Sequence, residues 1–345
     1  VTPNALLGWE ESRQTDIGVD LGFWGNSLQI TADWFNKKTA RMLQRMPVPG
    51  YLGESKPWGN VGTMSNRGAE MEISYRYSIG DFNFSVGGNV TYVNTILVNA
   101  GNETGVVETA SYHQMGTIAR GQNGMVYPYF YGYKTDGVFQ NWAEVNSYVN
   151  ADGKLIQPDA QPGDFRYVDI DGNGSITAEG DRTMLGKCFA PWIYGFNASI
   201  DWKGIDFSMI WQGVAGNSIF DGTRRTDIPV MNQPKYVLNR WTGEGSTNEY
   251  PRFTNTDPNQ NWSKASSFFI KDASYFRLKN ITLGYTLPAK WTKKVFVKKL
   301  RVYAACENAF TFTNYDGFDP EIASYMDRGV YPQARTVQFG ANITF

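Results

Sequence analysis

The chain has 345 residues, a formal net charge of −1, 15% aromatic residues and 36 glycines. This nearly balanced charge gives no support to binding of nucleic acid or of an anionic membrane surface. Aromatic residues favour strands and glycines favour turns, so the composition predicts an all-β chain. No run of about 18 apolar residues predicts a membrane helix. Cys188 and Cys306 form no CxxC motif and do not indicate a redox compartment.

Alternation of apolar and polar residues predicts strands along most of the chain. In chain order, the expected strands cover residues 15–23, 27–38, 66–79, 82–92, 192–202, 205–213, 275–287, 299–310 and 335–345. A further strand is assigned within 108–126, mainly to keep the strand directions consistent, and the expected total is about eleven. Short turns join the hairpins. Long segments lie between the hairpins, at 43–65, 141–191, 214–273 and 311–333.

The expected strands have one apolar, aromatic face and one face of charged and amide side chains. The residues expected to face lipid are Met71, Ile73, Tyr75, Phe84, Val86, Phe196, Ile200, Phe207, Met209, Leu283, Val337, Phe339 and Ile343. Those expected to face a water-filled lumen are Glu70, Glu72, Arg76 and Gln338. Unpaired charges are rare inside a soluble β-core but ordinary inside a membrane barrel. The pattern therefore favours a transmembrane antiparallel β-barrel with long extracellular loops.

Two features of the sequence predict that this barrel is not fully regular and not closed. Arg277 and Lys279 have the same parity as Ile281 and Leu283, so a β-bulge, or a strand that begins outside the lipid, is expected there. If Phe345 ends on the periplasmic side, strand 15–23 also runs inward, and the chain would enter from outside. A complete single-chain barrel does not do this. The strands are therefore expected to form an open arc.

Several stretches resemble the C-terminal half of the SusC/RagA-like TonB-dependent outer-membrane transporters. They include "NVGTMSNRGAEMEISYR" (60–76), "FYGYKTDGVFQ" (130–140), "PGDFRYVDIDGNGSITAEGDRTMLG" (162–186), "ENAFTFTNYDGFDPEI" (307–322) and "YPQARTVQFGANITF" (331–345). The resemblances are long, occur in order and extend from about residue 8 to the end of the chain.

The resemblance implies a 22-stranded barrel with an N-terminal plug, in the outer membrane of a Gram-negative bacterium. It also implies import of glycans or oligopeptides with energy from TonB, and a SusD-like surface lipoprotein as a lid. The sequence contains no signal peptide, TonB-contacting segment or plug that resembles those of the family. Residues 1–345 are therefore expected to be a C-terminal part of the barrel, with about eleven of the 22 strands.

Two other classes of function are alternatives to an active transporter. A passive porin or structural barrel is the alternative reading, although simple porins do not carry stretches such as "TNYDGFDPEI". An enzyme is not expected, because no nucleophile–base pair occurs in a recognisable motif around His113, the one histidine of the chain.

An acidic stretch, "VDIDGNGSITAEGDR" (168–182), copies the first half of an EF-hand calcium loop. The twelfth position, which would be a bidentate glutamate, is Gly180, and the flanks have no helical periodicity, so a helix–loop–helix sensor is not expected. Two readings stay open. Either the stretch simply forms tight turns, or a structural Ca²⁺ is held by Asp169, Asp171, Asn173, the Ser175 carbonyl and Asp181.

Aromatic residues in or near the outer segments are candidates for substrate binding, because flat rings stack on sugar rings. They are Trp58, Tyr127, Tyr129, Tyr131, Trp142 and Trp262. Loop packing or an interfacial aromatic girdle is the alternative interpretation for each of them.

Overall fold

The fold was obtained as a computed structural model, which describes residues 4, 6–45, 53, 57–225 and 232–345, apart from the Val295 side chain. The predicted segment 43–65 lies partly outside these residues. In the described part of the chain, no helix is long and apolar enough to cross a membrane.

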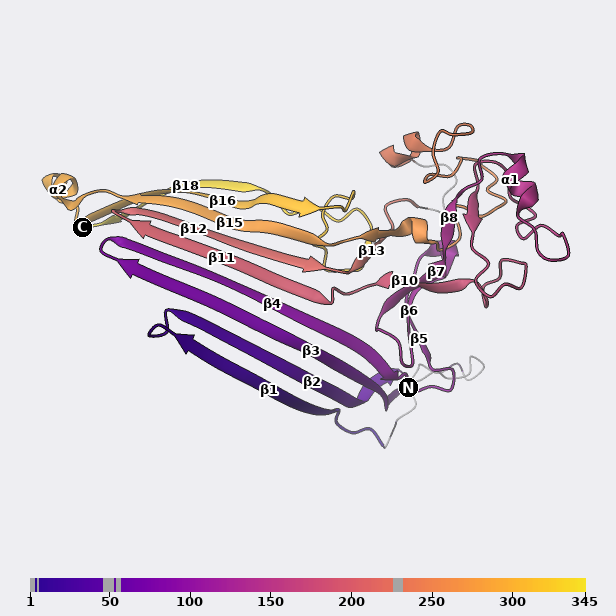
Figure 1. Cartoon of the computed structure of the whole chain (residues 1–345), viewed down its shortest axis with the longest axis horizontal. Helices are drawn as coiled ribbons and strands as arrows, with labels where there is room; N and C mark the ends of the chain where they lie inside the picture. Colours follow the sequence, from indigo (N-terminus) through magenta and orange to yellow (C-terminus); the bar gives the residue numbers. More distant parts are fainter. Residues whose placement is uncertain (1–3, 5, 46–52, 54–56, 226–231) are drawn as a thin grey trace.

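The main feature is a long antiparallel sheet of nine strands in the described residues, in the order β1-β2-β3-β4-β11-β12-β15-β16-β18 (Figure 1). Neighbours in the sheet are therefore also successive long strands along the chain. The strands are β1 (Glu11–Phe23), β2 (Leu28–Arg45), β3 (Trp58–Ile79), β4 (Phe82–Asn99), β11 (Trp192–Trp202), β12 (Ile205–Ala215), β15 (Tyr275–Thr286), β16 (Lys299–Thr313) and β18 (Thr336–Thr344). Each coincides with an expected strand, and most are longer than expected. We call this sheet the wall.

All the tight turns of the wall lie at one end. They join β1 to β2, β3 to β4, and β11 to β12, and the last two contain Gly80 (φ 55°) and Gly204 (φ 89°). Positive φ is easy only for glycine, which explains why these hairpins reverse there. The short helices α2 (Ala289–Thr292) and η5 (Lys293–Val295) connect β15 to β16 at the same end, next to the carboxyl terminus (Figure 1). We call this the turn end and the opposite one the loop end.

The strand expected within 108–126 does not belong to the wall. β5 (Val106–Ser111) and β6 (Thr117–Gln122) join β7 (Tyr129–Tyr133) and β10 (Arg182–Lys187) in a separate four-stranded sheet. β4 pairs directly with β11 over eleven residue pairs, from Trp192–Tyr92 to Trp202–Phe82. β4 runs toward the loop end and β11 runs back, so no intervening strand is needed. The expected total of about eleven wall strands was therefore wrong for the described residues, which form nine.

Residues 100–191, 216–225, 232–274 and 314–335 fold together into a compact body at the loop end, which we call the loop body (Figure 1). The remaining elements of the loop body are η2 (His113–Met115), β8 (Thr135–Val138), α1 (Trp142–Ser147), β9 (Phe165–Tyr167), β13 (Ser218–Asp221), η3 (Lys235–Asn239), η4 (Ser267–Phe269), β14 (Ile270–Asp272) and β17 (Met326–Asp327). The main hydrophobic core lies here and contains Phe130, Phe220 and Phe269, each at most 1% exposed. The loop body thus has its own core, whereas the wall has no second sheet packed on it among the described residues.

The wall is open. β1 pairs on one side with β2, β18 pairs on one side with β16, and within the described ranges the two edge strands do not pair with each other. The expected open arc is confirmed. Unpaired strand edges offer a row of N–H and C=O groups to a further strand.

Candidate functional site

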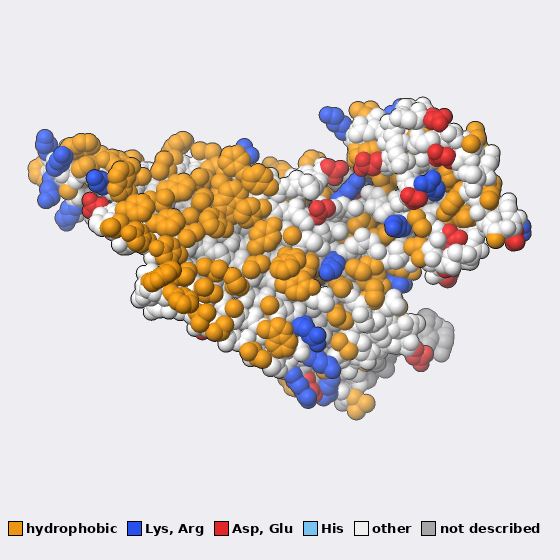
Figure 2. All heavy atoms as spheres, in the orientation of Figure 1, with side chains coloured by type: hydrophobic (Ala, Val, Ile, Leu, Met, Phe, Trp, Pro, Cys, Tyr) orange, Lys and Arg blue, Asp and Glu red, His pale blue; other side chains and the backbone are white. Residues whose placement is uncertain are grey.

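The register of the wall separates two chemically different faces. Directly opposed residues in an antiparallel sheet lie on the same face. One row across the wall is therefore apolar throughout, and Figure 2 shows the broad apolar surface that such rows form. Its members are Tyr77, Phe84, Ile200, Phe207, Leu283, Ala304 and Phe339.

Rows one residue away lie on the opposite face and are mainly polar or small. One contains Arg76, Ser85, Ser199, Ser208, Thr282, Ala305 and Gln338. All thirteen residues expected to face lipid lie on the apolar face, and Glu70, Glu72, Arg76 and Gln338 lie on the other. None of the thirteen is buried, and Phe339 is 81% exposed. They are therefore not the core of a soluble sandwich.

An ion pair crosses the polar face near the turn end. Arg301 on β16 donates to Asp206 on β12 through Nε (2.8 Å) and Nη2 (2.5 Å). The two side chains meet above Gly284 of the intervening strand β15, where an added Cβ would lie 2.4 Å from Asp206 Oδ2. A glycine is needed there because any side chain would block the bidentate contact.

The irregular strand β15 contains a β-bulge, one of the two arrangements expected there. The pairing with both β12 and β16 shifts at Lys279, which has no direct partner on either side. Beside the bulge, Arg277 is 3% exposed and donates to Asp319 Oδ1 (2.6 Å), Glu321 Oε2 (2.7 Å) and Thr311 Oγ1 (2.8 Å). Lys279 also binds Glu321, at 2.9 Å.

We call Arg277, Lys279, Asp319 and Glu321 the ion cluster. It ties segment 314–335 to the loop end of the wall. Sequence reasoning did not identify it, because the acidic partners lie some forty residues away in the chain. The one available sign in the sequence was that Arg277 and Lys279 interrupt the alternation of apolar and polar residues.

The candidate aromatic residues have very different environments. Tyr129 (1% exposed), Tyr131 (9%) and Trp262 (4%) are part of the loop-body interior. The ring of Tyr131 lies 3.4 Å from the Arg120 guanidinium and 4.3 Å from that of Arg182. Trp262 packs edge-on against Phe268, and the Arg224 guanidinium lies over the Trp262 ring, 4.1 Å from its centroid. Their surroundings leave no ring face for a ligand, which argues against these three as substrate-stacking residues.

The other three aromatic candidates are more accessible and are spread over the loop end. Trp142, in α1, is 56% exposed; Trp58, at the start of β3, is 47% exposed and has Arg45 over its ring at 5.4 Å. Tyr127 is partly buried, and burial raises the pKa of its hydroxyl. The described residues do not bring these three together into one site, so they stay separate candidates.

In the acidic stretch 168–182, backbone N–H groups donate hydrogen bonds to carboxylates of the same stretch. Asp169 accepts hydrogen bonds from Gly172 N and Gly174 N at 2.8 Å each. Asp181, which is fully buried, accepts from Ile170 N (2.7 Å) and Thr177 N (2.6 Å) and closes the loop. The flanks are strands β9 and β10, so the loop is not part of a helix–loop–helix unit, as expected.

The same stretch has the donor set of a calcium site. One oxygen from each of Asp169, Asp171 and Asp181 lies within 4.8 Å of the others. An ion about 2.3–2.6 Å from each oxygen fits that separation. Asp169, Asp171, Asn173, Ser175 and Asp181 would be the residues that hold it. The dense turn hydrogen bonds are equally what a loop without metal requires.

Comparison with known proteins places these features in context. The family model described as "TonB dependent receptor-like, beta-barrel" matches residues 1–177. TonB-dependent receptor P3 of Formosa agariphila is 29% identical, over 99% of this chain and 35% of its own length. TonB-dependent receptor SusC of Bacteroides thetaiotaomicron is 26% identical, over 99% of this chain and 32% of its own length.

Solved structures agree on the fold. A structure titled as the RagAB peptide transporter superposes with a TM-score of 0.77 at 21% identity, covering 100% of this chain and 36% of that one. A second, titled as the RagAB peptide importer in the "closed-closed" state, gives a TM-score of 0.77 at 22% identity. The chain thus spans about a third of the length of the relatives that it matches.

Proposed function

Since this chain belongs to the family of TonB-dependent receptor-like β-barrels, we propose that it forms part of an active importer of glycans or oligopeptides. Its location is the outer membrane of Gram-negative bacteria, where receptors of this family lie. The observation that carries the proposal is the two-faced wall: a continuous apolar face for lipid, backed by a polar face for a hydrated lumen.

We further propose that residues 1–345 are the C-terminal part of a larger barrel. The unpaired edges of β1 and β18 support this, because a wall in lipid must have every strand edge paired. The strands that complete the ring would pair with these two edges. The plug and the TonB contact would be supplied outside residues 1–345.

A SusD-like surface lipoprotein is the proposed partner at the loop end. The loop body supports this assignment, because its own hydrophobic core gives it a stable surface on which a lid can dock. RagAB, whose structure this chain resembles in fold, is described as a peptide transporter. For this chain, both the lid and the choice between glycan and peptide are proposals.

The test is uptake by the native bacterium. Cells of the wild type, a strain without this gene and a strain without TonB receive fluorescent oligosaccharide and oligopeptide mixtures. We expect uptake of one mixture to be lost in both mutant strains. Uptake that persists without TonB would instead indicate a passive porin, and uptake unaffected by deletion of the gene would contradict import. Purification of the tagged transporter should also recover a surface lipoprotein.

A further inference from the structure

We propose that a cavity at the loop end binds a neutral oligosaccharide, which would make glycan the substrate class of this chain. This inference rests on the proposed import function and goes beyond it by naming a site. The cavity measures about 760 Å³, within the range of about 300–1,000 Å³ that is typical of ligand pockets. We call it the loop-end pocket.

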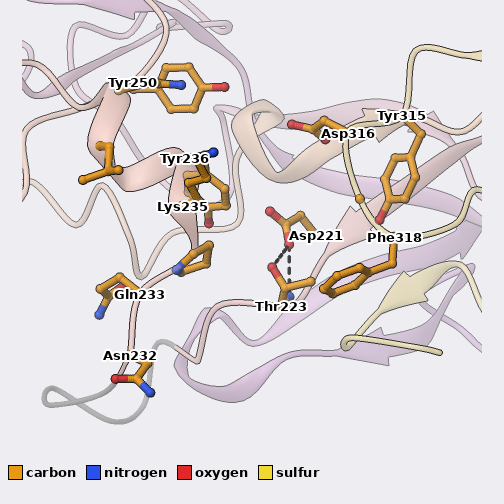
Figure 3. A pocket seen from close by; sticks show the side chains of 14 residues that line it. Asp221, Thr223, Asn232, Gln233, Lys235, Tyr236, Tyr250, Tyr315, Asp316 and Phe318 are labelled. Carbon is orange, nitrogen blue, oxygen red and sulfur yellow. Dashed lines mark hydrogen bonds between the residues drawn. The ribbon is translucent and has the colours of Figure 1, made fainter. Parts of the chain in front are cut away.

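The pocket lies between two groups of residues that are far apart in the chain (Figure 3). Tyr236 and Lys235, in η3, lie on one side, and Tyr315 and Phe318 on the other, with Asp221 between them. Asp221 ends β13, the strand of the loop body that follows β12 of the wall. The pocket therefore lies at the loop end of the wall. In the proposed function this end faces the outside of the cell, from which a substrate would arrive.

Phe318 is an exposed ring on a firmly held backbone. Tyr315, three residues earlier, is 7% exposed and donates from its hydroxyl to Asp327 Oδ2 at 2.5 Å. Asp319, the residue directly after Phe318, is 3% exposed and belongs to the ion cluster. Gly317 lies against the Tyr315 ring so closely that a Cβ would be 2.3 Å from it.

Between these anchors the Phe318 side chain is 69% exposed. The fixed backbone means that its exposure does not come from a loose loop. A fixed aromatic face that projects at a cavity is suited to stack on the apolar CH face of a sugar ring. Tyr250 lines the pocket as well and offers a second partly exposed ring.

The polar lining matches hydroxyl groups better than charges. Besides the phenol groups of its three tyrosines, it consists of two carboxylates, three amides, one aliphatic hydroxyl and one ammonium group: Asp221, Asp316, Asn232, Gln233, Asn239, Thr223 and Lys235. Carboxylates accept and amides both donate and accept, so together they satisfy sugar hydroxyls, which do both. The two carboxylates outnumber the single lysine, which disfavours uronate and sulfated sugars.

One buried polar atom beside the pocket lacks a partner. The Tyr236 hydroxyl is inaccessible to solvent and has no hydrogen-bond partner among the described residues. An unsatisfied buried hydroxyl costs roughly 1–3 kcal/mol in proteins. A small shift of Tyr236 on binding would let a ligand hydroxyl, or a water bridged to one, satisfy it.

A peptide is a poorer fit, because β13, the strand that reaches the pocket, offers no free edge to a further strand. Extended peptides usually bind by adding a strand to a sheet. The strand that reaches the pocket, β13, already pairs with β14 on one side and with β17 on the other. A peptide backbone would thus find no free edge on β13 with which to pair.

The test measures binding to the full-length transporter in detergent. The probes are arrays of neutral glucan, mannan, xylan and galactan oligosaccharides, a set of uronate oligosaccharides, and a pool of tryptic oligopeptides. Phe318→Ala is compared with Tyr331→Ala, because Tyr331 is 88% exposed on the same segment but does not line the pocket. Asp316→Asn probes the charge preference.

We expect a neutral oligosaccharide to bind the wild type and Tyr331→Ala alike, and Phe318→Ala to weaken it at least about tenfold through loss of ring stacking. Asp316→Asn should relax the exclusion of uronates. Peptide binding that depends on Phe318 would overturn the sugar assignment and leave import intact. Sugar binding unaffected by Phe318→Ala, or no oligosaccharide bound by the wild type, would also overturn it. Whether the protein imports a substrate at all is measured separately, by the TonB-dependent uptake experiment in the native bacterium.

Discussion

Arg277 and Asp319 form an ion pair at 2.6 Å in which both side chains are almost fully buried, although 42 residues separate them. Asp319 is also bonded by the backbone N–H groups of Glu321 (2.9 Å) and Gln333 (2.7 Å). One carboxylate thus joins the bulged part of β15 to two places in the segment that carries Phe318, one at Glu321 and one at Gln333. A buried pair is costly to break, because the partner left behind is an unpaired charge in a dry site.

Replacing Arg277 with Met should therefore destabilise segment 314–335 by about 3–5 kcal/mol, the cost of leaving one partner of a buried pair. Lys279→Ala is the matched control, because its contact with Glu321 is about a quarter exposed and should be worth less than about 1 kcal/mol. Limited proteolysis and hydrogen exchange of residues 314–335 measure both effects. Equal protection in the two variants would contradict a special role for Arg277.

The same pair predicts a pH dependence. Burial alone would raise the pKa of Asp319, but hydrogen bonds from Arg277 and from the backbone of Gln333 and Glu321 outweigh it and hold that pKa below its usual value. Because the folded pKa is the lower one, the stabilisation is complete above the unfolded pKa of about 3.9. It is lost as the pH falls through the folded value. Hydrogen exchange of 314–335 in wild type and Asp319→Asn should differ at pH 6 and converge in strong acid.

If the acidic stretch 168–182 holds Ca²⁺, we expect weak binding, with a Kd of roughly 10⁻⁴–10⁻³ M, as in extracellular modules. The double change Asp169→Ala and Asp171→Ala should abolish it, and chelation should make the stretch more sensitive to protease without altering the wall. Asp152→Ala, an exposed aspartate of the same loop body, is the control. Terbium luminescence and calorimetry give the affinity. Protease sensitivity that is independent of Ca²⁺ would leave only the turn-forming role.

Gly180→Ala tests the same site without removing a ligand. A Cβ at this position would lie 2.0 Å from Asp171 Oδ2, so the exposed carboxylate must swing away. We expect metal affinity to fall severalfold while the fold of the loop survives, because only the far end of a side chain has to move. Affinity equal to that of the wild type would show that Asp171 is not a ligand.

A charge on the apolar face should be far more costly than the same charge on the polar face. Met209→Arg places a guanidinium in the row formed by Val86, Ala198 and Ile281. We expect a loss of about 2–4 kcal/mol near the bilayer midplane. Ser208→Arg, one residue away but on the polar face, is the control and should cost little. Urea titration of the full-length protein in lipid vesicles compares them, and equal losses would contradict the assignment of faces.

The sequence by itself determined the wall strands and their two faces. Alternation is a local property with a period of two residues, so Phe207 and Ser208 are assigned to opposite faces without knowledge of any partner strand. The short turns that join the hairpins were equally local features of the sequence. The broken parity at Arg277 and Lys279 likewise predicted an irregularity there, either a bulge or a strand that begins outside the lipid.

The tertiary structure alone decided what the long segments do. No local sequence pattern predicts that β4 pairs with β11, although the loop body separates the two strands in the chain. Nor does a local pattern predict that Tyr131 is enclosed between Arg120 and Arg182 while Phe318 stays exposed. The ion cluster and the loop-end pocket likewise join residues far apart in the chain. Burial and partnership depend on which segments meet, and that is a property of packing rather than of periodicity.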